Sequence, residues 1–184
     1  MLRRTLTICI LGLAIAALRA QQPPPSAPSG AAPATQPGQP AQGSPTSGNT
    51  MTPVERADAT PKDQLKNPYA DSDAAVVESG QKLYTSYACS GCHGGTGGGG
   101  MCPPLTNDIW VYGGDDDTLF RLIVYGSETL QGKGYSRKSQ ENVVGAMPAM
   151  GQIIKTDDDL WRILAFVRAN YHGAPECKFG CGAK

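Results

Sequence analysis

Two cysteines and a histidine lie close together near the middle of the chain: Cys89, Cys92 and His93 form the run Cys-Ser-Gly-Cys-His. The two intervening residues place the cysteine sulfurs about one helical turn apart. This C-x-x-C-H pattern is typical of covalent c-type haem attachment, in which both thiols form thioethers and the histidine ligates the iron. We therefore predict that Cys89 and Cys92 attach one haem c and that His93 is an axial ligand.

Two other kinds of site share part of this pattern. A C-x-x-C pair also serves thioredoxin-like redox chemistry, but that motif belongs to a βαβ context that the surrounding sequence lacks. The pair could also be half of a zinc site that recruits Cys177 and Cys181. A histidine directly after the second cysteine, in a chain with an export signal, favours haem over zinc.

The second axial position has several candidates. The other histidine, His172, lies at the end of a predicted helix, where a cation complements the helix dipole. Met101, Met147 and Met150 remain, and a thioether suits ferrous iron and raises the reduction potential relative to a second imidazole. Residue type alone leaves Met147 and Met150 open, and either could instead pack against the haem as an apolar filler.

Three segments with helical periodicity must position these residues. The first covers residues 74–87, the second begins after Gly114 and ends at Gly126, and the third begins at a capping box that opens with Thr156. Nothing between them alternates for long enough to form a strand. We predict a small all-α domain with long glycine-rich loops around one haem.

Two features of these helices need a structural reason. Gly80 in mid-helix costs about 1 kcal/mol relative to alanine, which indicates a close crossing by another helix. Asp115, Asp116 and Asp117 lie at the positive end of the second helix. They could steer a basic partner, although helix capping alone accounts for them.

The N-terminal third has the composition of an exported protein. A positive start and an apolar stretch at residues 5–18 predict a signal peptide, too short for a membrane span unless it stays uncleaved as an anchor. A stretch rich in Pro, Gln and Ser follows and predicts a disordered linker. The predicted organisation is a signal peptide at 1–20, a linker at 21–54, an extended lead-in at 55–73, the folded domain at 74–173 and a cysteine-containing tail at 174–184.

Charge restricts the class of partner. The 16 Lys and Arg residues balance 16 Asp and Glu, and loss of three arginines with the signal would leave the protein slightly acidic. This argues against nucleic acid, which needs clustered basic residues. We expect a periplasmic monomer that meets redox proteins through small, transient contacts.

Three cysteines remain after haem attachment, namely Cys102, Cys177 and Cys181, since Cys9 would leave with the signal. An oxidising compartment favours one disulfide and leaves one thiol over. A bridge from Cys102 to the tail would close the longer loop and stabilise more in the chain-entropy model. We favour a bridge that uses Cys102, although spacing alone does not choose among the three pairings.

Taken together, the motifs resemble the single-haem class I cytochromes c. They are Gly80-x-x-x-Tyr84, Cys89-x-x-Cys92-His93-Gly94, Pro103-x-Leu105, Met147-Pro148 and the amphipathic last helix, and they extend over about residues 74–172.

The resemblance assigns roles to individual residues. It implies that Gly80 lets the first helix approach Phe166 on the last, that the Pro103 carbonyl holds the ring N–H of His93, and that Met147 is the second axial ligand. Cys102 stands where the family usually has glycine. Trp110, Tyr112 and Tyr135 could hydrogen-bond the haem propionates or simply pack in the core.

A finer resemblance concerns the electron donor. The attachment motif together with residues 103–110 is similar to the L-type cytochromes that accept electrons from quinoprotein methanol and alcohol dehydrogenases. This implies a periplasmic electron carrier, not an enzyme, between a pyrroloquinoline quinone (PQQ) dehydrogenase and another cytochrome or a terminal oxidase. The alternatives are an enzyme or sensor with a labile sixth ligand, or a tethered subunit of a larger respiratory complex.

Overall fold

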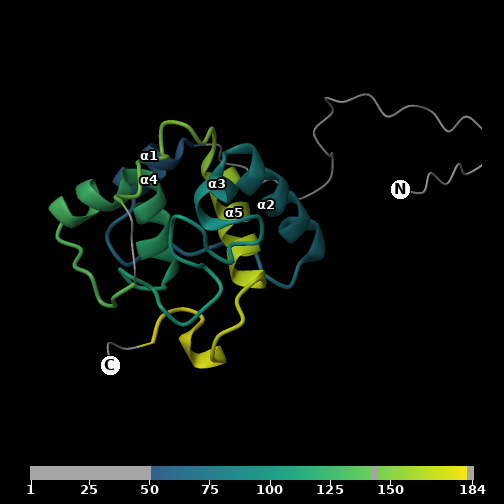
Figure 1. Cartoon of the computed structure of the whole chain (residues 1–184). Helices are drawn as coiled ribbons and strands as arrows, with labels where there is room; N and C mark the ends of the chain where they lie inside the picture. The colour runs from purple at the N-terminus through teal and green to yellow at the C-terminus, as the bar shows by residue number, and fades with distance from the viewer. Residues whose placement is uncertain (1–50, 142–144, 182–184) are drawn as a thin grey trace, which may run out of the picture. The chain divides into compact units, whose positions relative to one another are not determined.

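The computed structural model describes residues 51–141 and 145–181 (Figure 1). Within these ranges the chain is helical and contains no strand, which confirms the all-α prediction. The elements are α1 (Pro53–Ala59), α2 (Ala74–Ser86), α3 (Cys89–His93), α4 (Asp116–Gly132), α5 (Asp157–Ala169) and a short 3-10 helix (Pro175–Cys177). None of the helices in the described part of the chain combines the length and apolar character needed to cross a bilayer.

Helices α2 and α5 cross in close contact and form the centre of the domain (Figure 1). At the crossing Gly80 faces α5, and a Cβ built there would lie 3.0 Å from the Cβ of Phe166. The rings of Tyr84 and Phe166 pack with centroids 5.1 Å apart. The predicted close approach at Gly80 is therefore confirmed, because a larger residue would push the two helices apart.

The helix beginnings follow the predicted capping residues. The Asp73 carboxylate accepts from the N–H groups of Ala75 and Val76, and the Thr156 hydroxyl accepts from Asp159. These bonds satisfy backbone donors that have no partner inside the helix.

The acidic run before α4 serves the fold. Asp115 caps α4 through the N–H of Thr118 at 2.8 Å, and Asp116 accepts from the N–H of Asn67 at 3.0 Å. Asp117 is buried and pairs with Arg121 at 2.9 Å. The capping interpretation is thus confirmed for Asp115.

The predicted end of the second helix at Gly126 is confirmed as a break in the helical path but not as the end of α4. Gly126 adopts the left-handed φ of 71°, which breaks the helical path, but α4 resumes at once and continues to Gly132. A glycine that interrupts a helix and a glycine that ends one leave the same signal in the sequence, so periodicity could not separate them.

The predicted extended lead-in at 55–73 is wrong at its start, where α1 lies. Thr52 and Glu55 form a capping box, with the Thr52 N–H donating to the Glu55 carboxylate at 2.9 Å, and Pro53 takes the first helical position. The packed structure therefore begins before residue 54, the predicted end of the linker. The predicted signal peptide and the linker up to residue 50 lie outside the described residues.

Candidate functional site

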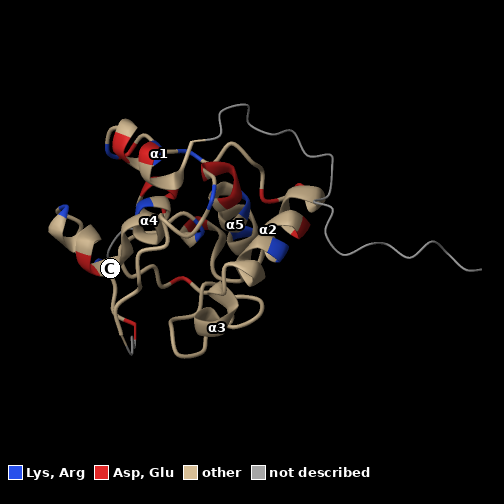
Figure 2. Cartoon of the chain, turned by 90° about the horizontal axis from the view of Figure 1, so that it is seen from above, with Lys and Arg blue, Asp and Glu red and all other residues tan. Residues whose placement is uncertain are grey.

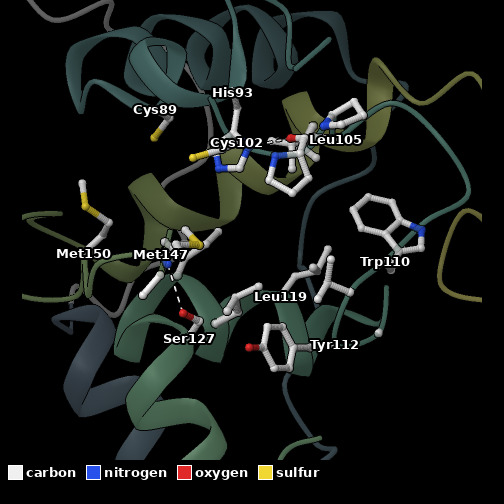
Figure 3. Close-up of a pocket in the computed structure, with 18 of the residues that line it drawn as sticks. Cys89, His93, Cys102, Leu105, Trp110, Tyr112, Leu119, Ser127, Met147 and Met150 are labelled. Carbon is white, nitrogen blue, oxygen red and sulfur yellow. Dashed lines mark hydrogen bonds between the residues drawn. The ribbon is translucent and has the colours of Figure 1, made fainter. Parts of the chain in front are cut away.

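An apolar cavity of about 380 Å³ lies among α3, α4, α5 and the loops that connect them (Figure 3). His93 enters from the side of α3, and Met147 lies across the cavity from it. Apolar side chains make most of the wall, including Leu105, Leu119, Leu122, Ile123, Ile163, Leu164 and Val167. The cavity thus brings together residues from both ends of the folded domain.

The cysteine motif forms the short helix α3, and a neighbouring tyrosine fixes its end. The Tyr84 hydroxyl donates to the Gly94 carbonyl at 2.9 Å, which ties α2 to the residue after the motif. Cys89 and His93 line the cavity. The Cys92 thiol makes a hydrogen bond with the thiol of Cys102, which lines the same cavity. Both thiols of the motif therefore lie at or beside one wall.

The loop after α3 orients the His93 ring. The ring Nδ1 lies 2.8 Å from the Pro103 carbonyl oxygen, which can only accept, so Nδ1 donates. The N–H of Cys102 donates to the Cys92 carbonyl at 3.1 Å and holds this loop against α3. The other ring nitrogen, Nε2, is then without a proton and able to bind a metal, which is the tautomer that a ligating histidine needs.

Burial keeps the nearby thiols protonated in the protein. Burial raises the pKa of the Cys89 thiol above its ordinary value. Burial, together with the neighbouring Cys92 thiol, also raises the pKa of Cys102. A raised pKa at Cys89 is the opposite of the lowered pKa that a redox-active C-x-x-C cysteine needs, which argues against thioredoxin-like chemistry.

Both methionine candidates line the cavity, but they occupy different places. Figure 3 shows Met147 facing the His93 side and Met150 farther to one edge. Met101 is not part of the wall and is 62% exposed. His172 also lies outside it.

Two of the three aromatic residues considered for propionate contacts are engaged elsewhere. The Trp110 ring N–H donates to the Cys177 carbonyl at 3.0 Å, and the Tyr135 hydroxyl donates to Asp117 at 3.0 Å. Tyr112 lines the cavity, with Arg137 over its ring at 6.0 Å. The sequence did not identify Arg137 as a residue of the cavity wall, because it lies in a loop with neither helical periodicity nor a motif.

Charge is unevenly distributed around the site. Figure 2 shows Lys, Arg, Asp and Glu on α1, α2, α4 and α5, whereas α3 and the loops beside it carry none. Residues 83–107 contain no charged side chain of these four types. The chain on both sides of the cysteine motif is therefore uncharged, and the charged residues of the cavity wall, Glu128 and Arg137, come from other segments.

The disulfide differs from the one we favoured from the sequence. Cys177 pairs with Cys181, while Cys102 stays free beside Cys92. The tail passes along Trp110 and reaches Asp108, where the Cys181 sulfur lies 3.9 Å from the backbone carbonyl oxygen, whereas Cys102 lies beside Cys92. This pairing also removes Cys177 and Cys181 as zinc ligands, and no cluster of three or more His, Cys, Asp or Glu that could hold a metal ion occurs among the described residues.

The arrangement fits one covalently bound haem. The cavity offers an apolar wall for a porphyrin, the thiols of Cys89 and Cys92 on α3, and a histidine whose tautomer is set for iron. A methionine sulfur is available on the opposite side.

The model of the family described as "Cytochrome C oxidase, cbb3-type, subunit III" matches residues 75–167. The chain is 37% identical over 62 residues to the cbb3-type cytochrome c oxidase subunit CcoP of Azospirillum brasilense, covering 30% of this chain and 21% of that protein. It is 38% identical over 58 residues to the same subunit of Cereibacter sphaeroides, covering 30% and 20%. The chain thus spans about a fifth of the length of these curated relatives.

One solved structure is also similar. Cytochrome CL of the marine methylotroph Methylophaga aminisulfidivorans aligns with a TM-score of 0.46 and 24% identity, covering 72% of this chain and 74% of that chain.

Proposed function

Because the chain belongs to the family of c-type cytochrome domains typified by subunit III of the cbb3-type cytochrome c oxidase, we propose that it is a periplasmic one-electron carrier whose haem c is held by four residues. Cys89 and Cys92 form the thioethers, His93 is the first axial ligand and Met147 is the second. Electron transfer is the shared role of c-type cytochrome domains, and covalently bound haem c is the cofactor.

The observation that supports this proposal most strongly is the placement of His93 and Met147 on opposite sides of one apolar cavity. The Pro103 carbonyl engages Nδ1 of His93, so Nε2 is the nitrogen that binds iron. The thioether of Met147 is the softer ligand and favours the ferrous state.

When bound, the haem supplies reversible one-electron chemistry at its iron. The chain's own residues then have three tasks. Cys89 and Cys92 would anchor the group, His93 and Met147 would ligate its iron, and the apolar wall would exclude water. With two side chains bound to the iron, no position would be left for a substrate, and we infer a carrier and not an enzyme.

The spectrum of the matured protein tests the ligand set. We expect a c-type pyridine haemochrome and the weak long-wavelength band of ferric iron bound to methionine sulfur. CO added to the reduced protein should leave the spectrum unchanged. A prompt shift with CO would mean an open or labile sixth position and would overturn the carrier proposal in favour of an enzyme or sensor.

For the donor, we propose a PQQ-dependent methanol or alcohol dehydrogenase. The support is the sequence stretch at residues 103–110 next to the attachment motif. The test is stopped-flow mixing of the oxidised cytochrome with the reduced dehydrogenase from the same organism. Haem reduction at the turnover rate of the dehydrogenase is expected, and reduction far slower than turnover would reject this donor.

For the acceptor, we propose another cytochrome or a terminal oxidase. The two curated relatives are by name subunits of an oxidase, which also favours a second candidate function, a cytochrome subunit tethered to a respiratory complex. Gentle solubilisation and affinity purification of the tagged full chain separate the two. A free carrier is recovered alone, whereas a subunit is recovered with stoichiometric oxidase polypeptides.

A further inference from the structure

The kink in α4 and the segment that carries Met147 are bonded to each other. The N–H of Ser127 donates to the Met147 carbonyl at 3.0 Å, and the N–H of Met147 donates to the Ser127 hydroxyl oxygen at 3.0 Å. The first bond depends on the break at Gly126, since in an unbroken helix the Ser127 N–H would donate four residues back along α4.

The same break frees acceptors that the methionine segment uses. The carbonyl groups of Ile123 and Val124 would serve α4 internally if the helix were continuous. Here the Ile123 carbonyl accepts from the N–H of Met150 at 2.9 Å, and the Val124 carbonyl accepts from Gly151 at 3.1 Å. Four hydrogen bonds therefore join residues 123–127 to residues 147–151.

The fit between these segments is also steric. A Cβ built at Gly126 would lie 2.6 Å from the Met147 carbonyl oxygen and 2.7 Å from the Ala149 nitrogen, both backbone atoms. The φ of 71° at Gly126 is itself a conformation that side chains disfavour. Only glycine allows both the kink and the close approach.

We propose that Gly126 and Ser127 are positioning residues that select Met147 over Met150 as the second axial ligand. The broken helix binds the backbone of residues 147–151 in one register, which keeps Met147 facing His93. The Met150 backbone is bonded to Ile123 at the edge of the cavity, so it cannot move in to replace Met147. This inference rests on the proposed function, because it takes Met147 to be the ligand.

The test uses the ferric holoprotein and measures how fast cyanide displaces the second axial ligand. The variants are Ser127→Ala and Gly126→Ala. Ser86→Ala and Gly132→Ala are their matched controls, since the exposed Ser86 hydroxyl donates only to the Lys82 carbonyl within α2, and a Cβ at Gly132 meets nothing within 4 Å. We expect Ser127→Ala to accelerate cyanide binding about tenfold, the size of effect that one lost hydrogen bond gives. Gly126→Ala should accelerate it further and weaken the sulfur–iron band, while both controls bind cyanide at the wild-type rate.

Two further results distinguish failure of the proposed ligand set from failure of the positioning role. If Met147→Ala keeps the sulfur–iron band, Met147 is not the ligand and the proposed ligand set fails. If Met147→Ala loses the band but Ser127→Ala keeps the wild-type cyanide rate, the ligand set stands and the positioning role is overturned. Should Gly126→Ala yield no holoprotein, Ser127→Ala alone decides, because its smaller side chain introduces no clash.

Discussion

A Cβ built at Gly80 on α2 would lie 2.0 Å from the backbone carbonyl oxygen of Arg162 on α5. That separation is far inside van der Waals contact, and the clashing atom belongs to the helix backbone, so it cannot move aside as a flexible side chain would. The crossing of α2 and α5 thus depends on the absence of a side chain at Gly80.

Gly80→Ala should therefore destabilise the holoprotein, although alanine is the better helix former. We expect a loss of about 3 kcal/mol in the free energy of unfolding, at the upper end of the usual overpacking cost. Denaturant unfolding followed by circular dichroism measures it. Gly132→Ala is the control and should be neutral or slightly stabilising, because a Cβ at Gly132 meets nothing within 4 Å. Equal midpoints for wild type and Gly80→Ala would contradict the close crossing.

The buried pair of Asp117 and Arg121 should make stability depend on pH in the acid range. Burial alone would raise the pKa of Asp117, but the hydrogen bonds from Arg121 and from the N–H of Leu65 outweigh it and lower the pKa below 3.8. A carboxyl whose pKa is lower in the folded state stabilises above its unfolded pKa, and the contribution is lost as pH falls through the folded value. Stability should therefore decline below about pH 4.

Asp117→Asn separates this pair from the other carboxyls. It leaves the Arg121 guanidinium without its counter-charge, although that side chain keeps a hydrogen bond to the Ala57 carbonyl at 2.7 Å. We expect a loss of about 3 kcal/mol at neutral pH and a shallower decline in acid. Denaturant midpoints measured across the acid range for both proteins provide the comparison. Parallel pH profiles would show that other carboxyls control the acid transition.

The predictions that succeeded rest on local chemistry. Gly80 was informative because a glycine within a helix has a cost that only close packing explains. Asp73 and Thr156 were correctly predicted as helix caps, because a cap bonds to backbone groups only two or three residues away. The motif at Cys89 and His93 is likewise contiguous, and the structure places both residues at one cavity.

The predictions that failed depend on contacts between distant segments. The kink at Gly126 is stabilised by hydrogen bonds to residues 147–151, about twenty positions later in the chain. The sequence around Gly126 contains no signal for these contacts. The missed helix α1 is an exception, because its capping box of Thr52 and Glu55, with Pro53 at the first helical position, is a local signal that the sequence carries. The pairing of Cys177 with Cys181 was missed because loop-closure entropy favours long loops, whereas the fold places Cys102 beside Cys92.

Peptide mapping of alkylated holoprotein tests the cysteine assignment. When the unreduced protein is denatured and alkylated, Cys102 should carry the label, while Cys177 and Cys181 should take it only after reduction. Cys89 and Cys92 should stay unlabelled in both samples because thioethers do not react. Label on Cys177 or Cys181 without reduction would contradict the disulfide, and a protected Cys102 would indicate a different pairing.

The last prediction concerns Arg168 on α5, which fastens the C-terminal tail to the cavity wall. Its guanidinium donates to the carbonyl groups of Lys178 and Gly114, pairs with Asp116 at 3.1 Å, and lies over the Trp110 ring at 5.2 Å. The residue is 2% exposed, so no water can replace these contacts. Lysine keeps the charge but lacks the planar fork that reaches several acceptors at once.

Arg168→Lys should therefore cost about 2–3 kcal/mol in the free energy of unfolding, the price of leaving buried carbonyl groups without donors. Arg56→Lys is the matched control, since Arg56 makes a single ion pair with Asp157 at 2.7 Å and its side chain is 26% exposed. Its loss should stay near or below about 1 kcal/mol. Thermal or denaturant unfolding of both holoproteins measures the difference. Similar losses in the two variants would mean that charge alone, without the geometry of the fork, holds the tail against Trp110.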